Sequence, residues 1–182
     1  VQHMVASMAE RTGRMAVVLP QGALFRKGAE GDIRQKLLEK DLIDAVIGLA
    51  PNIFYGTGLA PAVMVLRRVK PADRKGKVLI VDASSLFRKG RAQNYLDPEH
   101  AQQIVEWVGT FRDVEDRAKV IGLAEIRAED WTLNISRYVL PPVADNIPSL
   151  PEAVAAFKEA LTEARTAEAR LREVLIEGGW LK

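Results

Sequence analysis

Short apolar runs alternate with amphipathic and polar segments along the first half of the chain. The runs are rich in Val, Ile and Leu and lie at residues 14–19, 42–49, 62–66 and 77–82. Continuous runs of this kind are typical of strands that are buried on both faces of a sheet. Residues 30–40 instead place apolar side chains at helical spacing, with charged residues opposite them. The pattern therefore predicts an α/β fold that contains a strand–helix–strand unit with parallel strands, followed by a third strand that returns antiparallel.

The second half of the chain has fewer clear elements and ends in one long helical pattern. Pro98 opens a predicted helix, and the weaker signals of residues 113–140 include a predicted helix around Val120. Residues 141–151 form a predicted linker. Helical periodicity then runs from residue 152 to 177, with an apolar stripe formed by Val154, Phe157, Leu161, Ala164, Leu171, Val174 and Leu175. Such a stripe needs a partner, either the same domain or another chain.

The segment between the second and third apolar runs is the first candidate for a functional site. It joins two predicted strands and contains Asn52, Phe54, Tyr55, Gly56, Thr57 and Gly58. Closely spaced glycines allow positive φ angles or the close approach of a ligand to the backbone. Adjacent aromatic side chains at the rim of a sheet present flat apolar faces to a molecule that arrives from solvent.

Composition and charge narrow the classes of function. With 182 residues, of which 48% are hydrophobic and 27% charged, the chain is long enough for one domain with a helical extension. It has no cysteine, which excludes disulfides, thiolate metal sites and cysteine nucleophiles, and a cytoplasmic location fits this composition. Residues 1–91 carry 16 basic and 8 acidic residues, whereas residues 92–182 carry 10 and 16. This asymmetry has two interpretations. Either the first half faces a polyanion such as nucleic acid, or the charges are ordinary solvated surface residues.

Several sequence blocks, read in order, resemble one family. They are Gly13–Pro20, Gly22–Phe25, Ile33–Leu38, Val46–Leu49, Asn52–Gly58, Val78–Asp82 and Ile135–Val139. In this order they resemble the modification (methyltransferase, M) subunit of type I restriction-modification systems. The resemblance implies an S-adenosylmethionine-dependent DNA adenine-N6 methyltransferase with a doubly wound, Rossmann-like sheet. Residues 14–19, 42–49 and 62–66 would be the last three strands of that sheet, the final one antiparallel, followed by an α-rich C-terminal extension.

The family's motifs for methyl transfer are missing from this chain. S-adenosylmethionine would require a Gly-rich turn after a first strand with an acidic residue beyond it, and the sequence has no such arrangement. The family's Asn/Asp-Pro-Pro-Tyr/Phe tetrapeptide also has no match. We therefore expect a C-terminal segment that is inactive alone, with the donor site upstream. Residues 1–83 would complete the catalytic domain, residues 84–142 would form an α-rich extension, and residues 143–182 would form a linker and a helix for subunit contacts.

The resemblance also implies a role for the aromatic segment. An enzyme that modifies a base rotates that base out of the duplex and holds it partly by stacking. Related adenine methyltransferases use an aromatic residue in the loop between the sixth and seventh strands, which Phe54 resembles, with Tyr55 beside it. The base-pocket loop would be completed by Asn52, Gly56, Thr57 and Gly58. The alternative is that Phe54 plugs the core and Tyr55 is an ordinary surface residue.

Other polar residues give weaker indications. Arg67, Arg68 and Lys70 are candidates for contact with DNA phosphate, and solvated charge at a strand end explains them equally well. Asp82 ends an apolar strand and is typical of a turn or capping residue. Asn94 and Tyr95 either cap the following helix or face DNA. No residue in this segment is predicted to be catalytic, and the two histidines, 97 positions apart, do not suggest a metal pair.

The partners that the resemblance implies are double-stranded DNA, a specificity subunit, a second modification subunit and, in larger assemblies, a motor-nuclease subunit, with no membrane partner. The long terminal helix is the expected contact for the specificity subunit, with packing on its own chain as the alternative. A different class of function is a non-catalytic DNA-binding or assembly module that is derived from the same fold. A small nucleotide-binding protein is disfavoured because the sequence lacks a Gly-rich loop that could hold phosphate.

Overall fold

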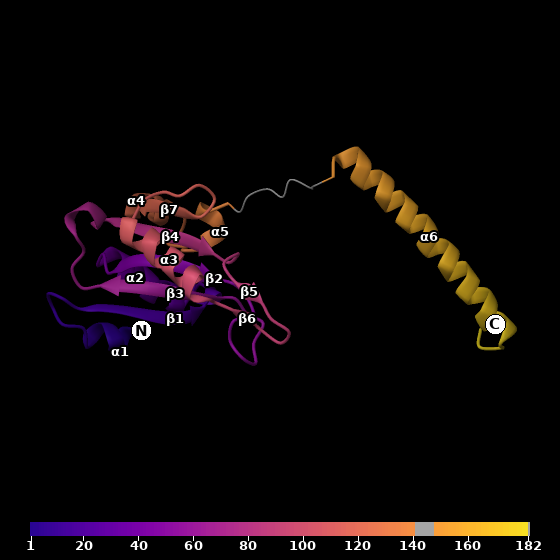
Figure 1. Ribbon diagram of the computed structural model, residues 1–182, viewed down its shortest axis with the longest axis horizontal. Coiled ribbons are helices and arrows are strands. Elements are labelled where there is room, and N and C mark those ends of the chain that lie inside the picture. The colour runs from indigo at the N-terminus through magenta and orange to yellow at the C-terminus, as the bar shows by residue number, and fades with distance from the viewer. Residues whose placement is uncertain (141–147, 182) are drawn as a thin grey trace. The chain divides into compact units, whose positions relative to one another are not determined.

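A computed structural model describes residues 1–140 and 148–181, and it divides the chain into two compact units, Val1–Pro142 and Val143–Lys182. The first unit is built on a five-stranded mixed sheet with the strand order β1-β3-β2-β4-β7 (Figure 1). Its strands are β1 (Arg14–Pro20), β2 (Ile43–Leu49), β3 (Pro61–Arg67), β4 (Lys77–Ala83) and β7 (Ala118–Gly122).

The strand directions confirm the predicted strand–helix–strand unit. β3 lies between β1 and β2 and pairs antiparallel with both, so that β1 and β2 run in the same direction. Helix α2 (Ala29–Glu39) connects them. β4 continues the sheet parallel to β2, and β7 closes it antiparallel to β4. In the described sheet β1 has β3 as its single neighbour, which leaves its outer edge open.

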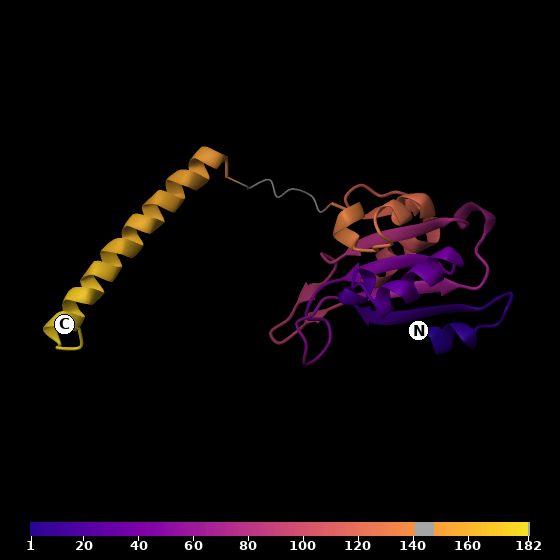
Figure 2. The ribbon, with the colours of Figure 1, turned by 180° about the vertical axis from the view of Figure 1, so that it is seen from behind.

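Helices cover both faces of the sheet (Figures 1 and 2). On one face lie α2, the 3-10 turn η1 (Gln21–Leu24), α4 (Leu123–Ala128) and α5 (Ile135–Tyr138), and on the other lies α3 (Pro98–Thr110). The two faces take alternate residues of each strand, as β4 shows: Val78 and Ile80 pack on the α2 side, whereas Leu79 and Val81 pack on the α3 side. All seven residues of β2 are buried, as expected for a continuous apolar run in the middle of a sheet.

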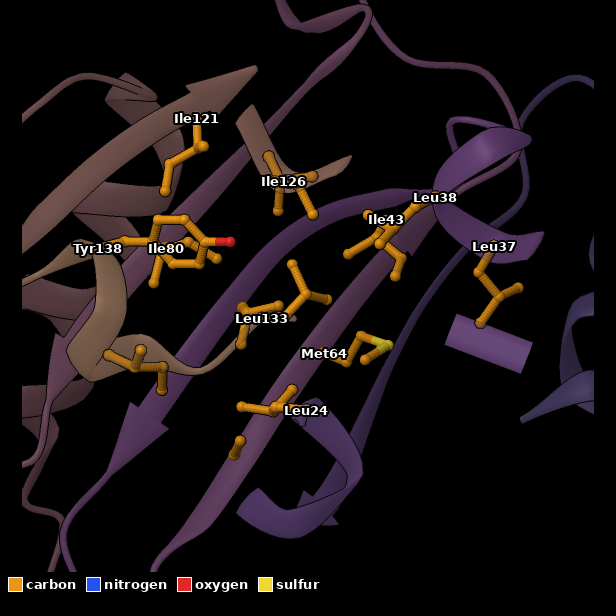
Figure 3. Close-up of a cluster of buried hydrophobic side chains, with 14 of the residues drawn as sticks. Leu24, Leu37, Leu38, Ile43, Met64, Ile80, Ile121, Ile126, Leu133 and Tyr138 are labelled. Atoms are coloured by element: carbon orange, nitrogen blue, oxygen red, sulfur yellow. The ribbon is translucent and has the colours of Figure 1, made fainter. Parts of the chain in front are cut away.

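The larger core lies between the sheet and the helices α2, α4 and α5 (Figure 3). Side chains from distant parts of the sequence meet there, among them Leu24, Leu38, Ile43, Met64, Ile80, Ile126, Leu133 and Tyr138. Because Ile126, Leu133 and Tyr138 belong to this core, residues 123–139 are part of the same packed unit as the first four strands.

The helix predicted around Val120 is wrong, because this segment is strand β7. Ala118 and Ile121 are buried and Lys119 is exposed, and Val120 pairs with Leu79 of β4. The edge of β4 needs hydrogen-bond partners, and this long-range pairing outweighs a weak local helical signal. The described part of the predicted α-rich extension, residues 84–140, thus supplies a strand of the main sheet in addition to three helices, together with a small hairpin of β5 (Arg88–Lys89) and β6 (Asn94–Tyr95).

Three remaining elements complete the described chain. The short helix α1 (Gln2–Ala6) precedes β1, and the 3-10 turn η2 (Ala72–Arg74) lies between β3 and β4. Helix α6 (Leu150–Glu177) forms the second unit and begins with a capping box, in which the Glu152 carboxylate accepts a hydrogen bond of 2.8 Å from the Ser149 backbone N–H. Most of the linker predicted at residues 141–151 lies outside the described residues. Of the helices that the structure describes, none is long and apolar enough to cross a membrane.

Candidate nucleic-acid interface

The aromatic loop, residues 50–60, lies at the edge of the sheet where the parallel strands end. β1, β2 and β4 run in the same direction, so the segments that follow them all emerge at this one edge. The aromatic loop follows β2, and the β5–β6 hairpin follows β4. Open α/β sheets bind their ligands at this carboxyl edge, because loops from several strands meet there.

The aromatic loop presents two ring side chains to solvent. Phe54 is 44% exposed and Tyr55 is 93% exposed. The preceding residue, Ile53, packs instead against the core on the α3 side of the sheet. The loop is thus anchored by Ile53, and the alternative in which Phe54 plugs the core does not fit its exposure.

The turn after the two rings depends on one of the two glycines. Gly56 has a φ angle of 78°, a backbone conformation that glycine adopts readily, and Gly58 is not among the positive-φ residues. The Thr57 hydroxyl accepts a hydrogen bond of 3.2 Å from the Leu59 N–H, which closes the turn. A Cβ built on either glycine has no neighbouring atom within 4 Å, so the space beside this turn is open.

Hydrogen bonds join the aromatic loop to the β5–β6 hairpin, about 40 positions later in the sequence. The Asn94 side-chain amide donates to the Pro51 carbonyl at 2.8 Å, and the Asn94 backbone N–H donates to the Asn52 carbonyl at 2.7 Å. In return, the Asn52 side-chain amide donates to the Ala92 carbonyl at 3.3 Å. Figures 1 and 2 both show the loop between β2 and β3 projecting beside the hairpin. Asn94 therefore holds the aromatic loop, a role that the sequence did not reveal.

The hairpin is also fixed at its base. The Arg88 guanidinium donates two hydrogen bonds to the Asp97 carboxylate, at 2.7 and 3.1 Å, and lies over the Tyr95 ring at 4.7 Å from its centroid. The hydrogen bond from Arg88 lowers the pKa of Asp97, and the same bond raises the pKa of Arg88. Asp97 is in turn the N-cap residue of α3, so the hairpin is connected to the start of that helix.

The three cations proposed for phosphate contact lie at the opposite edge of the sheet, because β3 runs away from the aromatic loop. Arg67 donates to the fully buried Asp44 carboxylate at 2.7 Å. The Lys70 side chain is 1% exposed, and its ammonium donates to Asp41 at 2.6 Å and to the Lys77 carbonyl at 2.6 Å. Arg68 is half-buried. Their geometry indicates that Arg67 and Lys70 secure the chain beyond β3, and it disfavours contact with phosphate.

Other residues that the sequence analysis considered have local structural roles. Asp82 accepts a hydrogen bond of 2.9 Å from the Ser84 N–H, which confirms it as a turn residue. His100 accepts a hydrogen bond at 3.1 Å from the Asp97 N–H as part of the α3 capping box. The Tyr138 hydroxyl is in the core and donates to the Thr132 carbonyl at 2.8 Å. Within residues 1–140 and 148–181, no group of acidic and histidine side chains could hold a metal ion.

Comparison with known proteins decides the family. The family model described as N-6 DNA Methylase matches residues 1–146. The chain belongs to the N-6 DNA methylase family. Among the relatives is the type I restriction enzyme MjaVII methylase subunit of Methanocaldococcus jannaschii, which is 40% identical over 80% of this chain and 26% of that protein. Another is the type I restriction enzyme MpnII methylase subunit of Mycoplasma pneumoniae, 32% identical over 70% of this chain and 23% of that protein.

Solved structures of N-6 DNA methylase relatives show the same fold. The crystal structure of a type I restriction-modification methyltransferase subunit from Streptococcus thermophilus matches with a TM-score of 0.65 and 42% identity, over 70% of this chain and 26% of that chain. The EcoKI M protein matches with a TM-score of 0.57 over 93% of this chain and 42% of that chain; at 22% identity this match supports the fold alone. The chain spans about a quarter of the length of the first methylase relatives.

Proposed function

We propose that this chain is the C-terminal segment of a site-specific DNA adenine-N6 methyltransferase subunit of a type I restriction-modification system. In this proposal the aromatic loop is the wall of the pocket that receives the target adenine. The observation that carries it is the pair of exposed rings, Phe54 and Tyr55, at the carboxyl edge of the sheet in a member of the N-6 DNA methylase family. The sheet order supports the proposed strand equivalence, because an antiparallel strand lies between two strands of common direction.

Stacking explains why an aromatic residue is useful at this position. Rotating an adenine out of the duplex loses its stacking and pairing, which costs a few kcal/mol. A ring against the base face recovers about 1 to 3 kcal/mol. Phe54 is only partly exposed and is held by the anchored loop, so its ring orientation is more restricted than that of Tyr55. We therefore assign the stacking face to Phe54 and an outer contact to Tyr55, with Asn52, Gly56, Thr57 and Gly58 shaping the loop.

The described residues do not fit an S-adenosylmethionine site. The turn after β1 contains one glycine, Gly22, and not the series of glycines that lets a backbone approach the nucleotide part of such a donor. The end of β2 is wholly buried and carries no acidic residue that could bind a ribose. We propose that the methyl donor and the catalytic residues lie in a part of the protein outside residues 1–182, and we assign no step of methyl transfer to this segment.

The test uses the complete methyltransferase with Phe54 changed. The target sequence is first identified by mapping N6-methyladenine in DNA that the enzyme has modified. A duplex with 2-aminopurine at the target position then reports base rotation by its fluorescence. We expect Phe54→Ala to weaken base binding by about 1 to 3 kcal/mol. Phe54→Trp should retain most of the signal, whereas Phe54→Leu, which keeps an apolar side chain without the ring face, should lose it.

A mismatch opposite the target adenine sharpens this test. Because a mismatched base is easier to unpair, the Phe54→Ala enzyme should recover part of its methylation rate on mismatched DNA. Methylation by Phe54→Ala at unaltered rate and affinity would refute the stacking role. A complete enzyme that binds DNA without methylating it would instead favour the non-catalytic assembly module.

The proposal includes partners of the complete protein. They are double-stranded DNA, a specificity subunit, a second modification subunit and, in larger assemblies, a motor-nuclease subunit. Helix α6 is the proposed contact for the specificity subunit, because an apolar stripe that includes Phe157 and Leu171 is exposed along it. Action on cellular DNA would place the protein in the cytoplasm.

A further inference from the structure

The β5–β6 hairpin carries positive charge on the side that faces the aromatic loop. Arg88 pairs with Tyr95 across the hairpin, and Lys89 pairs with Asn94. Residues directly opposite each other in an antiparallel pair share one face, so Lys89 is on the face of Asn94, whose side chain bonds to the aromatic loop at Pro51. Arg88 and Tyr95 occupy the other face, in agreement with their cation–π contact.

Two cations of the hairpin are available to an incoming anion. Lys89 and Arg91 are exposed, and among residues 1–140 and 148–181 neither has a carboxylate within ion-pair distance. Arg88 differs because both of its hydrogen bonds go to Asp97. The free charges are therefore concentrated at the tip and on the loop-facing side of the hairpin.

We propose that the β5–β6 hairpin is a phosphate-binding element of the DNA interface, in which Lys89 and Arg91 contact the DNA backbone beside the nucleotide that Phe54 holds. The proposal rests on the function proposed above, since it takes the aromatic loop as the place of the target base. The hydrogen bonds of Asn94 give the physical connection, because they fix the distance between these charges and the aromatic loop. A base can leave the duplex only if its backbone is displaced, and cations held beside the pocket can retain that displaced backbone.

The test measures how DNA affinity depends on salt. Each phosphate that a cation neutralises adds about 0.9 to the slope of log affinity against log salt concentration. The complete methyltransferase complex carrying Lys89→Ala and Arg91→Ala should therefore show a slope that is shallower by about 1.8. The probe is an unmodified duplex that contains the sequence that the enzyme methylates, and the readout is fluorescence anisotropy over a series of KCl concentrations.

Arg11→Ala with Lys75→Ala is a matched control. This pair removes the same two charges, and both residues are exposed at the opposite edge of the sheet, before β1 and before β4. Their removal should leave the slope unchanged. An unaltered slope in the hairpin variant, or an equal change in both variants, would overturn the proposal. Loss of binding to the specificity subunit with normal DNA affinity would overturn it as well, because it would make the hairpin a protein contact.

The two proposals fail separately. Phe54→Ala should reduce the 2-aminopurine signal and leave the salt slope intact, because a ring neutralises no phosphate. If the hairpin variant has a shallower slope while Phe54→Ala gives the same 2-aminopurine signal as the parent, the phosphate contact is supported and the stacking role is refuted. The reverse pattern would keep the stacking role and remove the hairpin from the interface.

Discussion

At the scale of single residues, the buried polar groups each connect segments that are distant in sequence. Asp44 is fully buried and accepts hydrogen bonds from Arg67 at 2.7 Å and from Arg74 at 3.2 Å. Arg34 donates to the carbonyls of Trp131, Ala23 and Arg26 at 2.8 to 3.0 Å, and its burial lowers its pKa. A buried charge is costly unless it is paired or hydrogen-bonded, so these side chains are tied to one arrangement of the chain.

Tyr138 gives a prediction at this scale, because burial raises its pKa to about 12 from an ordinary value of 10.0. Below pH 10 the hydroxyl is protonated in both the folded and the unfolded states. As the pH rises from 10 towards 12, the unfolded chain ionises first, and folding stability that depends on the neutral hydroxyl is lost. We expect Tyr138→Phe to cost about 1 kcal/mol at neutral pH, since the Thr132 carbonyl loses its donor.

The measurement is the free energy of unfolding in urea, taken at a series of pH values for the parent and Tyr138→Phe. The parent should have the larger free energy of unfolding, and its difference from Tyr138→Phe should be constant up to about pH 10 and should shrink above it. The exposed Tyr55→Phe serves as the control and should differ from the parent by less than about 0.5 kcal/mol at neutral pH. A Tyr138→Phe difference that stays constant to pH 12 would show that the hydroxyl is not buried as described.

At the scale of elements, the β5–β6 hairpin depends on a glycine in its turn. A Cβ on Gly90 would lie 2.4 Å from the Tyr95 ring and 2.5 Å from the Gln93 carbonyl oxygen. The second of these atoms is backbone, so the turn itself has to move. The Gly90 N–H also donates to that same carbonyl at 3.1 Å, which closes the hairpin. We expect Gly90→Ala to open the hairpin and release the aromatic loop from Asn94.

Amide hydrogen exchange tests this prediction. Exchange of residues 88–95 and of the Asn94 amide in particular should accelerate in Gly90→Ala, while the main sheet stays protected. Gly109→Ala in α3 is the control, because a Cβ there meets no atom within 4 Å and Ala favours a helix by about 0.5 to 1 kcal/mol. Unchanged exchange over the hairpin in Gly90→Ala would mean that the turn accommodates the added methyl group.

At the scale of the whole molecule, the chain consists of a packed α/β unit and a helix whose side chains are largely exposed. The first unit has two cores of its own, one on each face of the sheet. Helix α6 has no buried residue, although its apolar stripe covers one side along most of its length. Exposed apolar area of this extent is typical of a surface that binds a partner.

We expect Leu161→Glu with Leu171→Glu to abolish assembly with the specificity subunit. The two carboxylates would have to be desolvated in the contact, whereas the first unit would keep its fold because its cores do not include α6. Analytical ultracentrifugation of the complete subunits measures assembly, and circular dichroism confirms that the protein is folded.

A second pair of substitutions controls for added charge. Ala155→Glu with Thr166→Glu introduces the same two carboxylates on the opposite side of α6, since a helix turns about 100° per residue. This pair should assemble normally. If both pairs assemble like the parent, the stripe is not the subunit contact, and packing on its own chain becomes the better explanation for it.

The sequence by itself determined most of the elements, because the continuous apolar runs became the strands β1 to β4, and β2 and β4 are buried on both faces as such runs predict. The prediction of burial on both faces is wrong for β1, which lies at the edge of the sheet and exposes alternate residues such as Val18. It also indicated that the loop after β2 would carry the exposed aromatic residues, since Phe54 and Tyr55 follow a strand that ends at the rim of the sheet. The spacing of Val154, Phe157 and Leu161 likewise defined the stripe of α6, because helical periodicity depends on local sequence alone.

Only the tertiary structure decided which residues meet. The pairing of β7 with β4, the bond from Asn94 to Pro51 and the burial of Lys70 against Asp41 join positions that are 29 or more residues apart. No local pattern distinguishes Lys70, which is buried in an ion pair, from Lys89, which is exposed beside the aromatic loop. The charge that a side chain can offer to DNA depends on the acidic and carbonyl groups that surround it after folding, and these come from other parts of the chain.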